Sequence, residues 1–230
     1  MRHLTNRARF LCAGGAAFAG GLLAAAPVSA AAPAGPQPTP DEALRRLTDG
    51  NRRYMADAAI YCNRNYDRRL ETAKGQMPFA IVLSCSDSRV PAEIVFDQRV
   101  GDLFLVRVAG NIAEPAGIAS IEYAVSHFHS PLLMVVGHES CGAVEATLDV
   151  LANGSVPPGH IATLTDAIAP AVRGVPKGTD MLDQAVRANA RYVARELPAQ
   201  STIVADAVRE SKLHIVAAYY SFADGAVVVI

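Results

Sequence analysis

Three short and almost uninterrupted apolar runs constrain the fold of this chain more than any other feature of its sequence. They are Phe79 to Leu83, Leu103 to Val108 and Leu132 to Val136. Apolar runs of this length, without alternating polar residues, are typical of parallel strands that are covered on both faces. The segments between the runs are long enough for crossover connections. The sequence therefore predicts an α/β fold with a central, mostly parallel sheet flanked by helices.

Segments with helical periodicity agree with this fold. They are Ile118 to His127, Ala143 to Leu151, Thr163 to Val172 and Met181 to Leu197. The end of the chain has a different pattern, because Ile215 to Phe222, a turn at residues 223–225 and residues 226–230 are typical of a hairpin. This pattern predicts two antiparallel strands at the C-terminal end.

A helical arm is predicted before the first strand. From Asp41, the sequence keeps Ala43, Leu47 and Tyr54 at near-helical spacing, with a break predicted at Gly50. Residues 31–40, which precede the arm, are rich in proline and alanine, as in a linker. An amphipathic helix has to pack against some other surface, so the arm is expected to have a partner surface.

The N-terminus has the pattern of an export signal. Three arginines among residues 1–9 precede an apolar stretch from Phe10 to Pro27, and Val28 to Ala30 fits a cleavage site. A retained membrane anchor is the alternative, but the stretch is weakly hydrophobic and no charged stop-transfer segment follows it. We therefore expect residues 1–30 to be removed from a periplasmic or secreted protein whose mature chain has no membrane span.

Length and composition limit the remaining choices. A chain of 230 residues can bury one substantial core, and we expect residues 41–230 to form a single domain. With 21 basic and 22 acidic residues, the chain lacks the basic field that nucleic-acid binding requires. Four cysteines are too few for a disulfide scaffold. Removal of residues 1–30 would leave Cys62, Cys85 and Cys141, of which Cys62 is expected to be a free or exposed thiol.

Two polar clusters directly follow the first and third predicted strands. Ser84 to Arg89 follows the first strand, and Gly137 to Gly142 follows the third. Ligands of open α/β sheets bind beyond the carboxyl ends of the strands. If the two strands are neighbours in the sheet, Cys85, His138 and Cys141 converge at that edge.

Two thiolates and one imidazole form a ligand set of catalytic zinc sites, which keep a fourth position for water or a carboxylate. Two other interpretations remain open. Cys85 and Cys141 could be small buried residues beside a hydrogen-bonded His138, or they could form a disulfide in an oxidising compartment. Asp87 and Arg89 favour the metal site, because beside a metal they form an ion pair or supply a switchable fourth ligand.

The combination of C-x-D-x-R, from Cys85 to Arg89, with H-x-x-C-G, from His138 to Gly142, resembles the beta-class carbonic anhydrases. The likeness runs from about Asp41 to Ile230. It implies an enzyme that interconverts carbon dioxide and bicarbonate by a zinc-bound hydroxide. It also implies four parallel strands plus an antiparallel one, and a homodimer or homotetramer in which the arm wraps a neighbouring subunit. Supporting likeness lies in Gly50 to Tyr54, Arg107 to Asn111, Ser120 to Val125 and Tyr220 to Val227.

The resemblance also assigns roles to single residues. It implies that Cys85, His138 and Cys141 bind Zn²⁺, and that Arg89 holds Asp87 off the metal so that water is the fourth ligand. Asp87 would then orient the hydroxide through a hydrogen bond. In other members the aspartate itself binds the zinc, and these carry a bicarbonate pocket that includes a tryptophan. Because this chain has no tryptophan, we favour the open form.

Two further residues are candidates for substrate binding. Gln76 stands where open-form members place a substrate-binding glutamine, and the backbone N–H of Gly142 could hold a substrate oxygen. Hydrolysis of carbonyl sulfide or carbon disulfide at the same site is one alternative activity, and a noncatalytic zinc or redox protein is another. Four other histidines are expected not to bind metal: His127, His129, His160 and His214.

Overall fold

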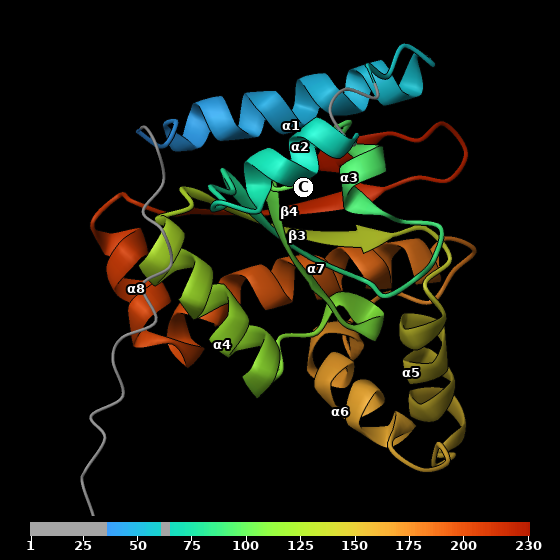
Figure 1. Ribbon diagram of the computed structural model, residues 1–230. Coiled ribbons are helices and arrows are strands. Elements are labelled where there is room, and N and C mark those ends of the chain that lie inside the picture. Colours follow the sequence, from blue (N-terminus) through green and yellow to red (C-terminus); the bar gives the residue numbers. More distant parts are fainter. Residues whose placement is uncertain (1–35, 61–64) are drawn as a thin grey trace, which may run out of the picture.

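A five-stranded sheet lies at the centre of the computed structural model, which describes residues 36–60 and 65–230 (Figure 1). The strand order is β2-β1-β3-β4-β5. The first four strands are parallel to their neighbours, and β5 is antiparallel to β4. This arrangement confirms the predicted α/β fold. The strands are β1 (Ala80–Ser84), β2 (Leu103–Arg107), β3 (Leu132–His138), β4 (His214–Tyr220) and β5 (Val227–Val229).

Helices cover both faces of the sheet, as Figure 1 shows. On one face lie α1 (Pro40–Met55), α2 (Tyr66–Thr72) and α3 (Ala92–Val95). On the other face lie α4 (Pro115–Tyr123), α7 (Met181–Gln200) and α8 (Thr202–Arg209). Two more helices pack beside α7, namely α5 (Gly142–Asn153) and α6 (Ile161–Val172). A π-helical turn, Ala124–Phe128, extends the end of α4.

The apolar character of β1 follows from its position between these two layers. Ala80 and Val82 belong to the core under α1, whereas Ile81 and Leu83 belong to the core over α7. Successive side chains of a strand point to opposite faces. A strand with helices on both sides therefore needs apolar residues at every position, and this is the reason for the uninterrupted run in the sequence.

Helix α1 packs on the sheet of its own chain, through the buried side chains of Ala43 and Leu47. The predicted break at Gly50 is wrong, because α1 continues through this residue to Met55. A Cβ atom at position 50 would lie 1.8 Å from the backbone oxygen of Phe96. Glycine at this position therefore allows a close approach of two backbones and does not end the helix.

Parts of the sequence prediction lie outside the described residues. These are the export signal at residues 1–30, residues 31–35 of the linker, and Cys62. Within residues 36–60 and 65–230, no helix is both long and apolar enough to cross a membrane.

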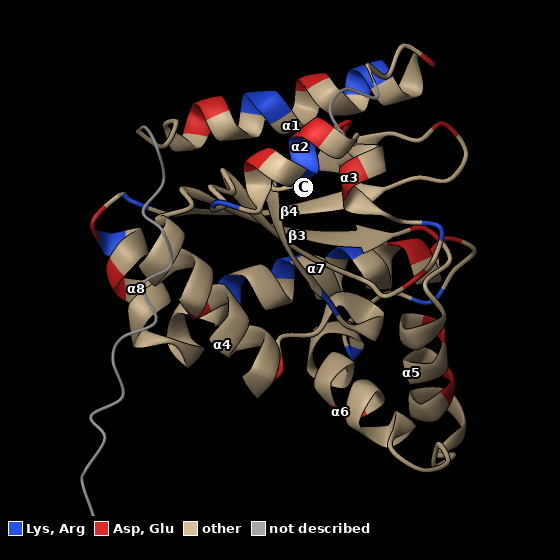
Figure 2. Cartoon of the chain, viewed as in Figure 1, with Lys and Arg blue, Asp and Glu red and all other residues tan. Residues whose placement is uncertain are grey.

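Acidic and basic residues alternate along α1 in Figure 2, whereas the strands and helices α4 and α6 are largely uncharged.

Candidate metal centre

The carboxyl ends of β1 and β3 lie side by side, since Ser84 is paired with Val136 in the sheet. The loops that follow these strands therefore meet, and they bring together Cys85, His138 and Cys141. One ligand atom from each of the three side chains lies within 4.8 Å of the other two, and all three residues are buried. Residues 53 positions apart in the sequence thus form one cluster, because neighbouring parallel strands end at the same edge.

The hydrogen bonds of the cluster fit a metal ion. His138 is 1% exposed, and its Nδ1 lies 2.8 Å from the backbone oxygen of Glu139, to which the ring N–H donates. This bond leaves Nε2 buried and, among the described residues, without a hydrogen-bond partner. Buried polar atoms are rarely left without a partner. Tetrahedral zinc ligands lie about 3–4 Å from one another, so the spacing and the chemistry of this donor set both suit Zn²⁺.

The two cysteines of the cluster are free thiols in the structure, not a disulfide. The hydrogen bond between their side chains lowers the pKa of Cys85 well below its ordinary value and raises that of Cys141. The two sulfurs therefore share one proton readily but lose the second with difficulty. A cation between them favours the fully deprotonated pair, which is the state that binds metal.

A backbone turn supports the sulfur of Cys85. The N–H of Gly110 donates to Cys85 Sγ over 3.3 Å, and the carbonyl of Gly110 accepts from Asn189 Nδ2 over 2.8 Å. Gly110 has a φ of +72°, and a Cβ atom there would lie 2.6 Å from the side chain of Ile168. Glycine is therefore required at the position that presents its N–H to the sulfur.

Asp87 and Arg89 form a two-bonded ion pair beside the cluster. Arg89 Nε donates to Asp87 Oδ1 over 2.9 Å, and Nη2 donates to Oδ2 over 2.7 Å. These hydrogen bonds lower the pKa of Asp87 to about 2. Asp87 Oδ2 also lies 3.9 Å from His138 Nε2. An ionised carboxylate, held by a guanidinium, thus faces the one unpartnered nitrogen of the cluster.

Arg107, at the end of β2, binds the backbone of the loop and not an acidic side chain. Its Nε donates to the carbonyl of Cys85 over 3.0 Å, and its Nη2 donates to the carbonyl of Asp87 over 2.6 Å. These two bonds fix the loop that carries both residues. The sequence marks Arg107 only through the family resemblance, which does not predict this contact.

The two candidate substrate-binding residues lie at opposite ends of the sheet. Gly142 is the first residue of α5, next to Cys141, and apart from its chain neighbours and its own helix no described residue lies within 4 Å of where its Cβ would be. Gln76 precedes β1 and lines a hollow of about 660 Å³ with Val100 and Leu103. Since β1 alone spans roughly 15 Å, the structure does not bring Gln76 to the cluster of the same chain.

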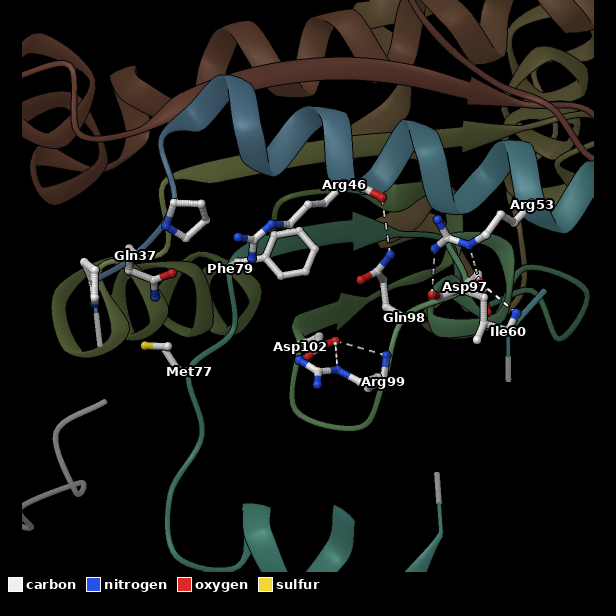
Figure 3. A pocket seen from close by; sticks show the side chains of 12 residues that line it. Gln37, Arg46, Arg53, Ile60, Met77, Phe79, Asp97, Gln98, Arg99 and Asp102 are labelled. Carbon is white, nitrogen blue, oxygen red and sulfur yellow. Dashed lines mark hydrogen bonds and ion pairs between the residues drawn. The ribbon is translucent and has the colours of Figure 1, made fainter. Parts of the chain in front are cut away.

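A second hollow, of about 460 Å³, lies near the amino ends of β1 and β2, and none of the described residues that line it is a cysteine (Figure 3). Its charged side chains bind one another. Arg53 Nε donates to Asp97 over 2.6 Å, and Arg99 Nε donates to Asp102 over 2.8 Å. The guanidinium of Arg46 lies over the ring of Phe79, 5.4 Å from its centre (Figure 3). Both of these carboxylates are therefore paired with guanidinium groups.

Comparison with known proteins gives one consistent result. A family model described as carbonic anhydrase matches residues 80–227. A carbonic anhydrase of Mycolicibacterium smegmatis is 38% identical over 193 residues, which are 84% of this chain and 94% of that protein. Carbonic anhydrase 2 of Mycobacterium tuberculosis is 37% identical over 191 residues, which are 83% and 92% of the two chains.

Solved structures have the same fold. The structure of the beta-carbonic anhydrase CcaA matches with a TM-score of 0.64 and 25% identity, over 81% of this chain and 94% of that one. A structure from a study of two tetrameric beta-carbonic anhydrases of Sordaria macrospora matches with a TM-score of 0.63. It is 20% identical and covers 82% of this chain and 97% of that one, so it bears on the fold alone.

Proposed function

Because this chain belongs to the beta-carbonic anhydrase family, we propose that it hydrates carbon dioxide reversibly at a zinc ion held by Cys85, His138 and Cys141. The observation that carries this proposal is the buried Nε2 of His138, which has no hydrogen-bond partner and lies within 4.8 Å of both sulfurs. A site that was merely structural would be expected to satisfy this nitrogen.

When bound, Zn²⁺ supplies Lewis-acid chemistry, because it lowers the pKa of water enough to provide a nucleophile for carbon dioxide near neutral pH. Asp87 would accept a hydrogen bond from such a water through Oδ2, the oxygen that lies 3.9 Å from His138 Nε2. Arg89 keeps the carboxylate ionised and fixes its direction through two hydrogen bonds. The two bonds from Arg89 to the carboxylate oxygens support the open form of the site, in which Asp87 does not bind the zinc.

Gly142 and Gln76 are proposed to bind the substrate. Gly142 has space in front of it and lies at the amino end of α5, where free N–H groups favour a partly negative oxygen. Gln76 could reach a metal centre only from a second copy of the chain, because it lies at the other end of the sheet. Substrate binding by Gln76 would therefore require that at least two copies of the chain assemble.

The proposed assembly is a homodimer or homotetramer in which two β2 strands pair. Strand β2 is at one edge of the sheet and pairs only with β1 among the described strands. Two edge strands related by a two-fold axis pair in antiparallel fashion. This pairing would place Gln76 of one copy near Arg107 of the other copy, at the carboxyl end of that copy's β2. Light scattering on the purified protein tests it, and a monomer at micromolar concentration would contradict it.

Export is proposed on the sequence pattern of residues 1–30 alone. The activity would then act on carbon dioxide and bicarbonate in the periplasm or outside the cell. N-terminal sequencing of the protein from its native cells tests this proposal, because a mature chain that begins near residue 31 is expected. A chain that retains Met1 would contradict it.

Two measurements on the purified protein test the activity itself. Metal analysis is expected to find about one zinc per chain, because a set of three protein ligands with an open fourth position binds one ion. Stopped-flow assay with a pH indicator is expected to find rapid hydration of carbon dioxide at mildly alkaline pH. Zinc-loaded protein that does not accelerate hydration would overturn the proposal.

A further inference from the structure

We propose that Phe222 is a positioning residue, whose ring holds the guanidinium of Arg89 and thereby fixes Asp87 beside the metal ligands. This inference rests on the proposed function for its catalytic consequence, but its structural part stands on contacts of the chain alone. Phe222 lies in the turn between β4 and β5, far in sequence from Asp87 and Arg89.

The ring of Phe222 contacts both parts of the site. The central carbon of the Arg89 guanidinium lies 4.1 Å from the centre of the ring, which is a close cation–π contact. The His138 ring lies 5.6 Å from it, and the Tyr220 ring meets it edge-on at 5.5 Å. Phe222 therefore touches a proposed metal ligand on one side and the partner of Asp87 on the other.

Arg89 needs such a contact because its side chain is 54% exposed. A long side chain in an exposed ion pair loses conformational entropy when it is held in one geometry, so the pair alone stabilises that geometry weakly. An aromatic ring against one face of the guanidinium restricts it further and excludes water from that face. The direction of the Asp87 carboxylate then depends on the ring as well as on the ion pair.

The turn that carries Phe222 is itself fixed from two sides. On the side of the metal centre, the N–H of Phe222 donates to Glu139 Oε2 over 2.7 Å. On the side of α1, the buried Asn51 donates to the carbonyl of Gly225 and accepts from the N–H of Val227, both over 2.8 Å. Glu139, in the loop after β3, and Asn51, in α1, thus hold the turn and the ring of Phe222 in place.

This arrangement gives a physical reason for two motifs that the sequence analysis singled out without a role. The Gly50 to Tyr54 segment supplies Asn51, and the Tyr220 to Val227 segment supplies the turn and the ring. Both segments act on Arg89 through Phe222, and Tyr220 is in addition the strand partner of His138. Sequence spacing could not show this, because the hydrogen bonds that fix the turn join residues that lie between 83 and 176 positions apart.

The test compares three substitutions in the zinc-loaded protein. Phe222→Leu removes the ring and keeps an apolar side chain, whereas Phe222→Tyr keeps the ring. Phe79→Leu is the matched control, because it also removes a ring beneath a guanidinium, that of Arg46, at the amino end of the sheet. Melting curves establish that each variant is folded, and Phe222→Met replaces Phe222→Leu if the latter does not fold.

Two readouts separate positioning from general stability. In ¹⁵N-labelled protein, the Arg89 side-chain N–H signal, assigned by its loss in Arg89→Lys, is expected to be shifted by the ring. Phe222→Leu should abolish this shift, while Phe222→Tyr and Phe79→Leu preserve it. The value of kcat/KM for hydration should fall about fivefold in Phe222→Leu, as expected for one cation–π contact, and stay within about twofold in the other two variants.

The outcomes distinguish this inference from the proposed function. If the Arg89 signal and kcat/KM are both unchanged in Phe222→Leu, the positioning role is wrong. If Phe79→Leu or Phe222→Tyr reduces kcat/KM as much as Phe222→Leu does, the effect is one of stability and the role is wrong. If the zinc-loaded wild type does not hydrate carbon dioxide but the Arg89 signal moves only in Phe222→Leu, the contact is supported and the proposed function falls.

Discussion

Each end of the sheet carries an arginine–aspartate ion pair, and the two pairs differ in the groups that surround the carboxylate. At the carboxyl end, Arg89 binds Asp87 through Nε and Nη2. Near the amino end, Arg99 binds Asp102 through the same two nitrogens, at 2.8 and 3.1 Å. A two-bonded arginine–aspartate pair therefore does not by itself mark a functional site.

The difference lies in the neighbours of each carboxylate. Asp102 also accepts from Arg68 Nη2 over 3.0 Å, so its oxygens are taken up by two guanidinium groups that tie α2 to the start of β2. Asp87 instead faces the unpartnered Nε2 of His138 and the two sulfurs. A pair whose bonds are complete stabilises the fold, whereas a pair beside unsatisfied ligand atoms can serve chemistry.

The largest expected effect comes from removing a sulfur at the carboxyl end. Cys141→Ser should release the zinc and lower kcat/KM by more than about 100-fold, because loss of a direct ligand costs more than loss of a group behind one. Metal analysis and the hydration assay measure both effects. Cys62→Ser is the control and should keep metal and activity. Full zinc content in Cys141→Ser would remove this sulfur from the ligand set.

A smaller effect is expected from parallel substitutions of the two aspartates. Asp87→Asn should keep the zinc and lower kcat/KM by about 100-fold, since a neutral amide accepts a hydrogen bond less strongly than a carboxylate and is not basic enough to take a proton. Its stability should change by less than about 1 kcal/mol, because the pair is partly exposed. Hydration kinetics and urea unfolding measure the two quantities in one preparation.

Asp102→Asn should show the reverse pattern. The side chain is 10% exposed and holds two arginines, so its neutralisation should cost about 2 kcal/mol or more of unfolding free energy. Activity of the folded variant should stay within about twofold of the wild type. If Asp102→Asn lowered kcat/KM as much as Asp87→Asn without a change in stability, the distinction between the two ends would be wrong.

The sequence alone predicted the central strands and the meeting of residues at the ends of neighbouring strands. Residues buried on both faces must be apolar at every position, so β1, β2 and β3 were visible as uninterrupted runs. Parallel neighbours end at one edge, so Cys85 and His138 could be expected to meet. The short helices α2, α3 and α8 were not predicted, because segments of four to eight residues carry too little periodicity.

Contacts between distant segments were beyond the reach of sequence patterns. The glycine at position 50 looked like a helix break, and only the nearby carbonyl of Phe96 shows that it allows close packing. The place of Gln76 at the far end of the sheet depends on strand direction and length. The contact of Phe222 with Arg89 depends on the fold of a turn that closes only when β4, α1 and the loop after β3 are in place.

The smallest expected effect concerns the start of α1, near the hollow at the amino end of the sheet. The N–H of Thr39 donates to Glu42 Oε2 over 2.8 Å, and this bond holds the pKa of Glu42 below its ordinary value of 4.5. A carboxylate with a lowered pKa in the folded state stabilises the protein above its unfolded pKa, and this contribution is lost as the pH falls through the folded pKa. Glu42→Gln should therefore be slightly less stable than the wild type at pH 7, and this difference should be smaller at pH 3.

Urea unfolding of both proteins at the two pH values measures this difference, and metal analysis at pH 7 serves as the control. Zinc content should be the same in the two proteins, because Glu42 touches no residue of the metal centre. Loss of zinc from Glu42→Gln at pH 7 would show that the amino end influences the ligand cluster. The ion pairs of the amino end would then have to be counted as part of the site, since charge at one end of the sheet would control metal binding at the other.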